Sequence, residues 1–214
     1  NDEIDILRDT GCYADFTMPS GGACQTRTIN TIYYAVDDPV RPFSHDRGRA
    51  IGKGPAPERG LLMIPGPLVL NWRNRKWGVI PRIENGCVQK SQQATFDRVA
   101  DWILAGVSVP NRPDWIFVKL HAHGAYEVGQ AALLGPEMVA FHESLAARMI
   151  SDPKFHVHYV TAREMYNLAK AAEAGFTGSI AEARDYELTW QGADATGVST
   201  TSVEAHGSPS ETLS

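Results

Sequence analysis

The sequence contains no long hydrophobic run and no excess of positive charge, and each absence excludes a class of protein. The most apolar stretch, Leu61–Leu70, is interrupted by Pro65, Gly66 and Pro67, so no segment approaches the roughly 20 apolar residues of a membrane-spanning helix. The chain has 20 Lys and Arg against 25 Asp and Glu, a net charge of −5. A dedicated nucleic-acid-binding protein needs a basic face instead. We therefore expect neither a membrane span nor a nucleic-acid partner.

Cysteine is also scarce, and the first residues lack the features of a leader. Cys12, Cys24 and Cys87 form no CxxC pair, so we expect small buried or partly exposed thiols, with a Cys12–Cys24 bridge as the alternative. Residues 1–8 (NDEIDILR) contain no initiator Met, no basic region and no apolar core, which excludes a signal peptide. Their pattern is typical of the interior of a helix. We therefore expect a chain truncated at its N-terminus, with its compartment unassigned.

The remaining pattern is typical of one α/β domain. The 214 residues, 43% hydrophobic and 21% charged, are enough to bury about 70% of the unfolded surface. After a helix expected at 95–105, the pattern is strand, helix, strand, helix over Asp114–His121, Pro136–Ile150, Phe155–Val160 and Thr161–Ala174. This alternation predicts parallel strands with covering helices, in a β/α barrel or an open sheet.

The apolar pattern fades after Gly178, and the last residues are rich in Ser, Thr and Gly. A segment of this composition buries too little apolar surface to offset its chain entropy. We therefore predict one domain over residues 1–180 and a disordered tail over residues 181–214.

The expected strand at 114–121 has two chemically different faces. Because side chains alternate along a strand, aliphatic residues share one face and polar residues the other: Ile116, Val118 and Leu120 against Phe117, Lys119, His121 and His123. The polar residues lie at the carboxyl end of the strand, where parallel α/β folds build their active sites. The two imidazoles could share a metal ion or divide metal binding and proton transfer. A buried hydrogen-bonded pair or a solvated strand end is the alternative.

Other candidate residues are less specific. Asp15, on a short strand expected at 13–18, could orient a catalytic histidine or cap the next loop. Trp72, Trp77 and Trp115 could stack on sugars, although we expect each of them in the core. A second His-x-His pair, at 156 and 158, lies earlier on its strand, and we expect a structural or surface role for it.

Three segments together resemble the polysaccharide deacetylase family. Phe117–Gly124 (FVKLHAHG) resembles the strand of that family that ends in a histidine. Phe155–Asn167 (FHVHYVTAREMYN) is similar to its final strand and helix. Residues 4–21, ending in YADFTMPSG, are similar to the helix and strand before its Pro-Gly loop. The resemblance spans Glu3–Gly178 and is closest to bacterial members associated with exopolysaccharide genes.

The resemblance implies a fold and a reaction. The fold would be the C-terminal part of a distorted (β/α)7 barrel. The reaction would be the removal of N- or O-linked acetyl groups from a polysaccharide with the help of a divalent metal, usually zinc. His121 matches the histidine that acts as general acid, with His123 and Asp15 as further catalytic candidates. Lys119 and Trp115 would bind substrate.

The resemblance also implies which parts are missing. The family's Asp-Asp motif and its metal-binding histidines would lie upstream of Asn1, and His123 is an additional candidate ligand. Thr17 stands where the family has an Arg, two residues before Pro19. A non-catalytic carbohydrate-binding or scaffold protein that kept the fold is therefore the main alternative. A different metal hydrolase with a His-x-His site is the third.

Overall fold

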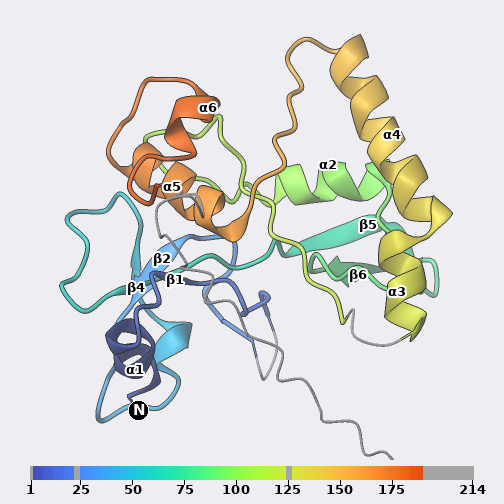
Figure 1. The fold of residues 1–214 in the computed structure, drawn as a ribbon. Coiled ribbons are helices and arrows are strands. Elements are labelled where there is room, and N and C mark those ends of the chain that lie inside the picture. Colours follow the sequence, from blue (N-terminus) through green and yellow to red (C-terminus); the bar gives the residue numbers. More distant parts are fainter. Residues whose placement is uncertain (1, 22–24, 124–126, 190–214) are drawn as a thin grey trace, which may run out of the picture.

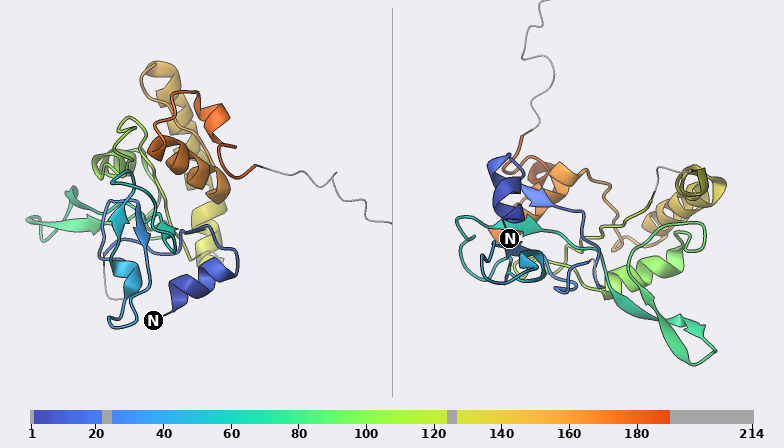
Figure 2. Two further views of the ribbon diagram at one scale, coloured as in Figure 1. Left: turned by 90° about the vertical axis from the view of Figure 1, so that its left-hand side faces the viewer. Right: turned by 90° about the horizontal axis from the view of Figure 1, so that it is seen from below.

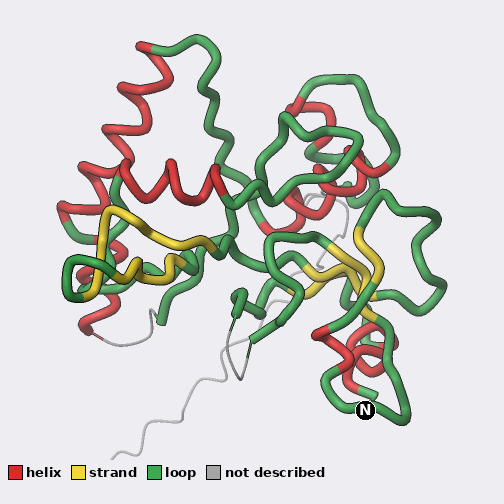
Figure 3. Tube along the Cα trace, turned by 180° about the vertical axis from the view of Figure 1, so that it is seen from behind, coloured by secondary structure: helices red, strands yellow, loops and turns green. Residues whose placement is uncertain are grey.

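The computed structural model describes residues 2–21, 25–123 and 127–189 (Figure 1). Its elements are α1 (Glu3–Asp9), β1 (Ala14–Asp15), β2 (Tyr33–Ala35), the 3-10 helix η1 (Ser44–Asp46), β3 (Arg49–Ala50), β4 (Leu61–Met63), β5 (Val69–Lys76), β6 (Ile80–Glu84), α2 (Phe96–Leu104), α3 (Glu127–Leu134), α4 (Pro136–Ser151), α5 (Ala162–Glu173) and α6 (Ile180–Ala183). Long loops join these elements, as Figure 3 shows. Among the helices of the described ranges, none has both the length and the apolar character that crossing a membrane requires.

A four-stranded sheet in the order β1-β4-β2-β3 organises the N-terminal half. β1 and β4 are parallel, with Asp15 opposite Met63, and β2 runs antiparallel to both β3 and β4. All residues of β2 and of β4 are buried. These strands are apolar throughout because both faces of the sheet are covered.

The two faces of the sheet pack into separate hydrophobic clusters. One face joins α5 in the largest cluster, which includes Tyr34, Leu62, Leu168 and Ala172. The opposite face packs against α1, in a cluster made of Ile4, Tyr33, Ala35, Leu61 and Met63. Successive residues of β2 and β4 therefore enter different clusters, as the alternation of side chains along a strand requires.

A third cluster lies between α2 and α4, around Trp102 and Phe141, whose ring centroids are 6.1 Å apart. The chain at 114–121 passes between this cluster and the one beneath α5. Val118 and Leu120 pack against the α2–α4 cluster, whereas Phe117 enters the α5 cluster. The expectation that the aliphatic face packs under helices is confirmed for Val118 and Leu120, whereas Phe117 of the expected polar face also enters the core.

The segment at 114–121 nevertheless differs from the expected strand. It is extended, but with the other described segments it forms one parallel bridge, between His121 and Cys87, and one bond, from the Phe117 amide to the Val107 carbonyl at 2.8 Å. No regular strand forms at residues 155–160 either, where one was expected. Alternating side chains identify an extended chain with one buried face, whereas a regular strand also needs a partner that continues the hydrogen-bond ladder. The described strands form an open sheet and a hairpin, and the partial barrel stays a prediction.

The helix predictions at 95–105, 136–150 and 161–174 are confirmed within one or two residues by α2, α4 and α5. At the start of α5 the Thr161 hydroxyl accepts a bond from the Glu164 amide at 3.2 Å. The Glu164 carboxylate accepts one from the Thr161 amide at 2.7 Å. This reciprocal capping box satisfies two backbone donors that the first turn leaves free.

Residues 181–189, expected in the disordered tail, are structured. A second capping box, between Ser179 and Glu182, opens α6, and Ala183 is fully buried. The Asn167 amide nitrogen of α5 donates to the carbonyls of Arg184 and Leu188, at 2.6 and 2.7 Å. These contacts with α5 supply the burial that the local composition did not indicate. Residues 190–214 of the expected tail lie outside the described residues.

Candidate functional site

The loops that follow the two parallel strands meet beside Lys119. The Lys119 amine donates to the Met18 carbonyl, after β1, at 2.9 Å. The Ser20 hydroxyl donates to the Gly66 carbonyl, after β4, at 2.5 Å. Parallel strands bring their carboxyl ends to the same edge of a sheet, so a site at this edge is built from loops distant in sequence. We call Asp15, Lys119, His121 and His123, with these two loops, the strand-edge site.

Gly66 allows the chain at 119 to approach this loop closely. A Cβ atom at position 66 would lie 2.9 Å from the Lys119 carbonyl oxygen, a distance that normal contacts do not reach. The adjacent Pro65 and Pro67 restrict the loop on both sides of the glycine. The Pro-Gly-Pro sequence that interrupts the most apolar stretch of the chain therefore positions the backbone of the strand-edge site.

Lys119 is a buried amine with one hydrogen-bond acceptor. Its residue is 8% exposed, and within the described ranges the Met18 carbonyl is its single hydrogen-bond partner. Burial lowers the pKa of the Lys119 amine to about 8, although the nearby negative charge of Asp15 acts in the opposite direction. An amine with two unused donors and such a pKa can release or accept a proton near neutral pH.

Asp15 caps its own loop. Its Oδ1 atom accepts bonds from the Thr17 amide at 2.6 Å and the Thr17 hydroxyl at 2.7 Å. Of the two roles considered for Asp15, the structure shows the capping contact. A role in orienting His121 stays a prediction, because none of the described hydrogen bonds joins the two side chains.

His121 is partly buried and poorly satisfied. Its backbone is fixed by bonds with Gly86 and Val88, at 3.0 and 2.8 Å. Its Nδ1 atom is buried and has no hydrogen-bond partner among the described residues. Burial lowers the pKa of His121, and the charges of Lys119 and His123 lower it further. The imidazole is therefore neutral at neutral pH, while His123, the other member of the pair, is exposed.

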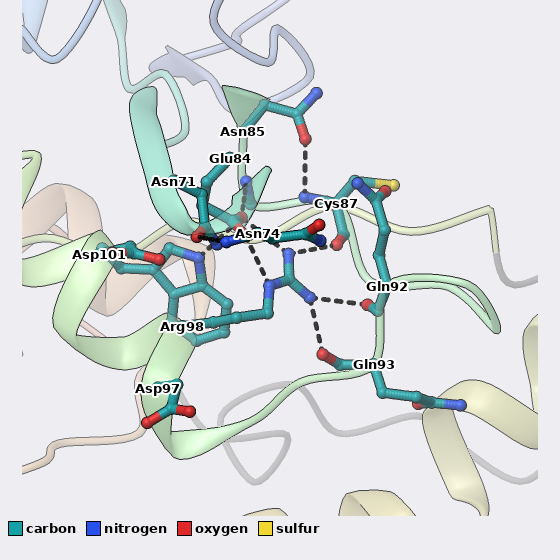
Figure 4. Close-up of polar contacts among 12 residues, drawn as sticks. Asn71, Asn74, Glu84, Asn85, Cys87, Gln92, Gln93, Asp97, Arg98 and Asp101 are labelled. Carbon is teal, nitrogen blue, oxygen red and sulfur yellow. Dashed lines mark hydrogen bonds and ion pairs between the residues drawn. The ribbon is translucent and has the colours of Figure 1, made fainter. Parts of the chain in front are cut away.

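A buried ion pair joins Glu84, at the end of β6, to Arg98 of α2 (Figure 4). All five N–H groups of the Arg98 guanidinium donate hydrogen bonds of 2.6–2.9 Å, two to Glu84 and one each to the carbonyls of Cys87, Gln92 and Gln93. Glu84 also accepts bonds from the Trp102 indole and the Gly86 amide, at 3.0 and 2.8 Å. The network therefore holds the turn whose next residues pair with His121.

Sequence reasoning missed Glu84 and Arg98, although a signal was present. Arg98 lies four residues before Trp102 in α2, so both side chains are on one helix face. A cation on the apolar face of a helix needs a buried acid, and Glu84 precedes a glycine turn that can deliver one. The sequence does not say which of the 25 acidic residues this is.

The tryptophans do not follow one rule. Trp115 packs partly against the α5 cluster, and the Arg112 guanidinium lies 3.9 Å from its ring centroid. One face of this ring is therefore already occupied. Trp72 and Trp77 are 57% and 77% exposed, so the expectation that they lie in the core is wrong. His156 and His158, for which we expected a structural or surface role, are exposed.

The metal site expected at the two imidazoles stays a prediction. Two hollows are described, of about 290 and 490 Å³. The first lies between α1 and η1, and the second is lined by Tyr34, Tyr166 and Lys170, so neither includes the strand-edge site. Within the described ranges, no group of three His, Cys, Asp or Glu side chains is placed to hold a metal ion.

Comparisons with protein-family models, with curated proteins and with solved structures each returned no match for this chain. The function of the chain is therefore inferred from the strand-edge site and from the resemblance of its sequence segments.

The proximity of Lys119 and His121 predicts a measurable coupling. Below pH 8 the Lys119 amine is charged and disfavours protonation of His121. In a Lys119→Met variant the pKa of His121 should therefore rise, as a histidine titration followed by NMR would show. A Lys154→Met variant, at an exposed position of the same charge, should leave that pKa unchanged. An unchanged His121 titration in Lys119→Met would contradict the electrostatic contact.

Proposed function

We propose that this chain is part of a deacetylase that removes N- or O-linked acetyl groups from a polysaccharide. The observation that carries the proposal is the strand-edge site, where a buried amine and a partly buried imidazole with an unpaired nitrogen follow each other on one extended segment. Hydrolytic sites of α/β folds occupy this edge of parallel strands. The sequence resemblance points to the same segment and supplies the substrate class.

His121 would supply the proton for the leaving group. Hydrolysis adds water to the acetyl carbonyl carbon and breaks its bond to the sugar nitrogen or oxygen, which must take up a proton as it leaves. Because the pKa of His121 is lowered, the resting imidazole is neutral at neutral pH and first accepts a proton from the water that attacks the acetyl carbonyl. It then returns this proton to the departing amine or alcohol. The Lys119 amine beside it would bind the substrate, and His123 and Asp15 are further candidates for catalytic roles.

The divalent ion that the resemblance implies, usually zinc, would polarise the acetyl carbonyl and activate water. The described residues do not fit a complete metal site, since they provide no group of three suitable side chains. We therefore propose no ligand set from this part of the chain beyond His123 as a single candidate. No step assigned to His121 or Lys119 depends on the metal geometry.

The test is acetate release from acetylated polysaccharides by the full-length protein. A His121→Ala variant should lose about 100-fold or more in turnover, the usual contribution of a positioned general acid. His156→Ala is the matched control, because it removes an exposed histidine of a His-x-His pair away from this site and should retain activity.

One outcome would overturn the role given to His121, and another the deacetylase proposal itself. Equal acetate release by wild type and His121→Ala would exclude the acid role. Glycan binding by the wild type without acetate release in the presence of divalent ions would select the non-catalytic carbohydrate-binding alternative.

A further inference from the structure

The β5–β6 hairpin projects from the rest of the molecule (Figure 2). It exposes large apolar side chains. Six of these side chains are 49–77% exposed: Leu70, Trp72, Trp77, Val79, Ile80 and Ile83. Single exposed apolar residues are normal on a protein surface, but a group of six within 14 consecutive positions indicates an interaction site. We call these six residues the hairpin patch.

The hairpin has a separate face for its contact with the body. Leu70 lies opposite Ile83, so these two side chains share one face, whereas Ile80, which pairs with Lys76 three residues before Ile83, lies on the other face near the tip. Arg73 faces α2, where its guanidinium donates to the Asp97 carbonyl at 2.6 Å and to the Asp101 carboxylate at 2.5 Å. The hairpin patch is therefore distinct from the part of the hairpin that contacts α2. In the described part of the chain, its exposure is a property of the folded hairpin.

The hairpin is also basic, although the chain as a whole is acidic. Between positions 69 and 83 it carries four cations and no acid. Arg73 is neutralised by α2, whereas Arg75, Lys76 and Arg82 form no ion pair among the described residues. The Lys76 amine lies 4.2 Å from the Trp77 ring centroid, and the Arg75 guanidinium 5.7 Å from that of Trp72. Cations and apolar groups thus lie next to one another around the tip of the hairpin.

Two of the conceivable occupants fit this surface poorly. In a symmetric pair, a second copy would place the same patch against itself and bring three unpaired cations of each chain together. A soluble polysaccharide could stack on the indoles, but it offers nothing apolar to the aliphatic side chains of Val79 and Ile80.

An anionic bilayer surface matches both the apolar and the cationic side chains near the tip of the hairpin. Arg82 is two residues from Ile80, or about 7 Å along an extended strand. Apolar groups of surface-bound proteins enter the boundary between headgroups and acyl chains by about 5–10 Å, so cations at this separation lie at the level of the lipid phosphates. We infer that the hairpin docks on anionic lipid bilayers, with Trp77, Val79 and Ile80 inserted and Arg75, Lys76 and Arg82 facing the phosphates. This inference is independent of the proposed function.

Co-sedimentation with vesicles tests the inference. The full chain should bind vesicles of phosphatidylcholine with about 30% phosphatidylserine and not bind phosphatidylcholine alone. Each of Arg75→Gln and Lys76→Gln should lower binding about fivefold, and a Trp77→Ala, Val79→Ser double variant should lower it about tenfold. Lys154→Gln and Ile150→Ser, at exposed positions on or next to α4, should bind as the wild type does.

Far-UV circular dichroism and thermal unfolding should show that the hairpin variants fold as the wild type, because the substituted side chains are exposed. The inference is overturned if the wild type does not bind the anionic vesicles, or if the double variant binds them equally. It is also overturned if the charge variants lose binding to soluble dextran sulfate while vesicles are not bound, which would select a polyanionic glycan. Dimerisation lost in the double variant would select a second copy.

Discussion

Replacing Arg98 with methionine should lower the free energy of unfolding by about 3–5 kcal/mol. The substitution would leave the Glu84 carboxylate buried without its cation and would also remove the donors to the carbonyls of Cys87, Gln92 and Gln93. Urea titration at neutral pH measures the change. Arg98→Lys should recover part of it, because an ammonium group keeps the charge but has three donors for five acceptor contacts.

The matched control is Arg27→Met. Arg27 is an exposed arginine whose ion pair with Asp46 has an N–O distance of 3.4 Å, and such surface pairs contribute about 1 kcal/mol or less. If Arg98→Met cost no more than Arg27→Met, the network would not hold the fold together. Amide exchange gives a second readout, since the Val88 amide that donates to the His121 carbonyl should exchange faster in Arg98→Met.

The Glu84–Arg98 pair should also make the protein sensitive to acid. Burial alone would raise the pKa of Glu84, but the hydrogen bonds from Arg98, Trp102 and Gly86 lower it overall. When folding lowers the pKa of a carboxyl group, that group stabilises the fold at any pH above its pKa in the unfolded chain. The stabilisation is lost as the pH falls through its pKa in the folded protein. The stability difference between wild type and Arg98→Met should therefore narrow below pH 4.5.

The second large effect concerns Lys119. Its pKa falls from 10.5 in the unfolded chain to about 8 in the folded protein, so holding the charged amine inside costs about 3 kcal/mol below pH 8. Between pH 8 and 10.5 the unfolded chain binds this proton and the folded protein does not, so stability gains this amount as the pH rises. Lys119→Met removes the charge and should therefore be more stable than the wild type at pH 7. The gain is reduced by the loss of the hydrogen bond to the Met18 carbonyl.

The comparison of the two proteins across pH isolates Lys119. Burial raises the pKa of Tyr33 to about 12, so its ionisation lowers the free energy of unfolding above pH 10. This loss is the same in the wild type and in the variant, and it cancels in their difference. The difference in unfolding free energy between Lys119→Met and wild type should therefore shrink from pH 7 to pH 11. A constant difference over this range would show that the Lys119 amine titrates normally. A buried group that lowers stability while serving a site is a common cost of function.

Local chemistry was enough to predict several elements. Two local patterns, each within one or two turns of helix, predicted helices correctly. The capping box of Thr161 and Glu164 predicted α5, and the spacing of Val99 and Trp102 predicted α2. Alternation also predicted which side chains of an extended segment face inward. Phe155 and Val157 pack against the α2–α4 cluster although no strand forms there.

Non-local contacts decided the rest. The hydrophobicity of Trp72 and Trp77 predicted burial, but burial also requires a surface that covers them, and α2 covers the other face of their hairpin. Residues 181–189 are structured because α5 offers them a buried asparagine, which their own composition does not reveal.

The sequence by itself determined that Lys119 and His121 share one side of an extended segment, because alternation is a property of the backbone. Only the tertiary structure decided what surrounds them. The Met18 carbonyl is 101 positions away from Lys119, and Glu84 and Arg98 are 14 positions apart. Partners at such separations are chosen by packing and by the hydrogen bonds that buried polar groups must form, and no local pattern records that choice.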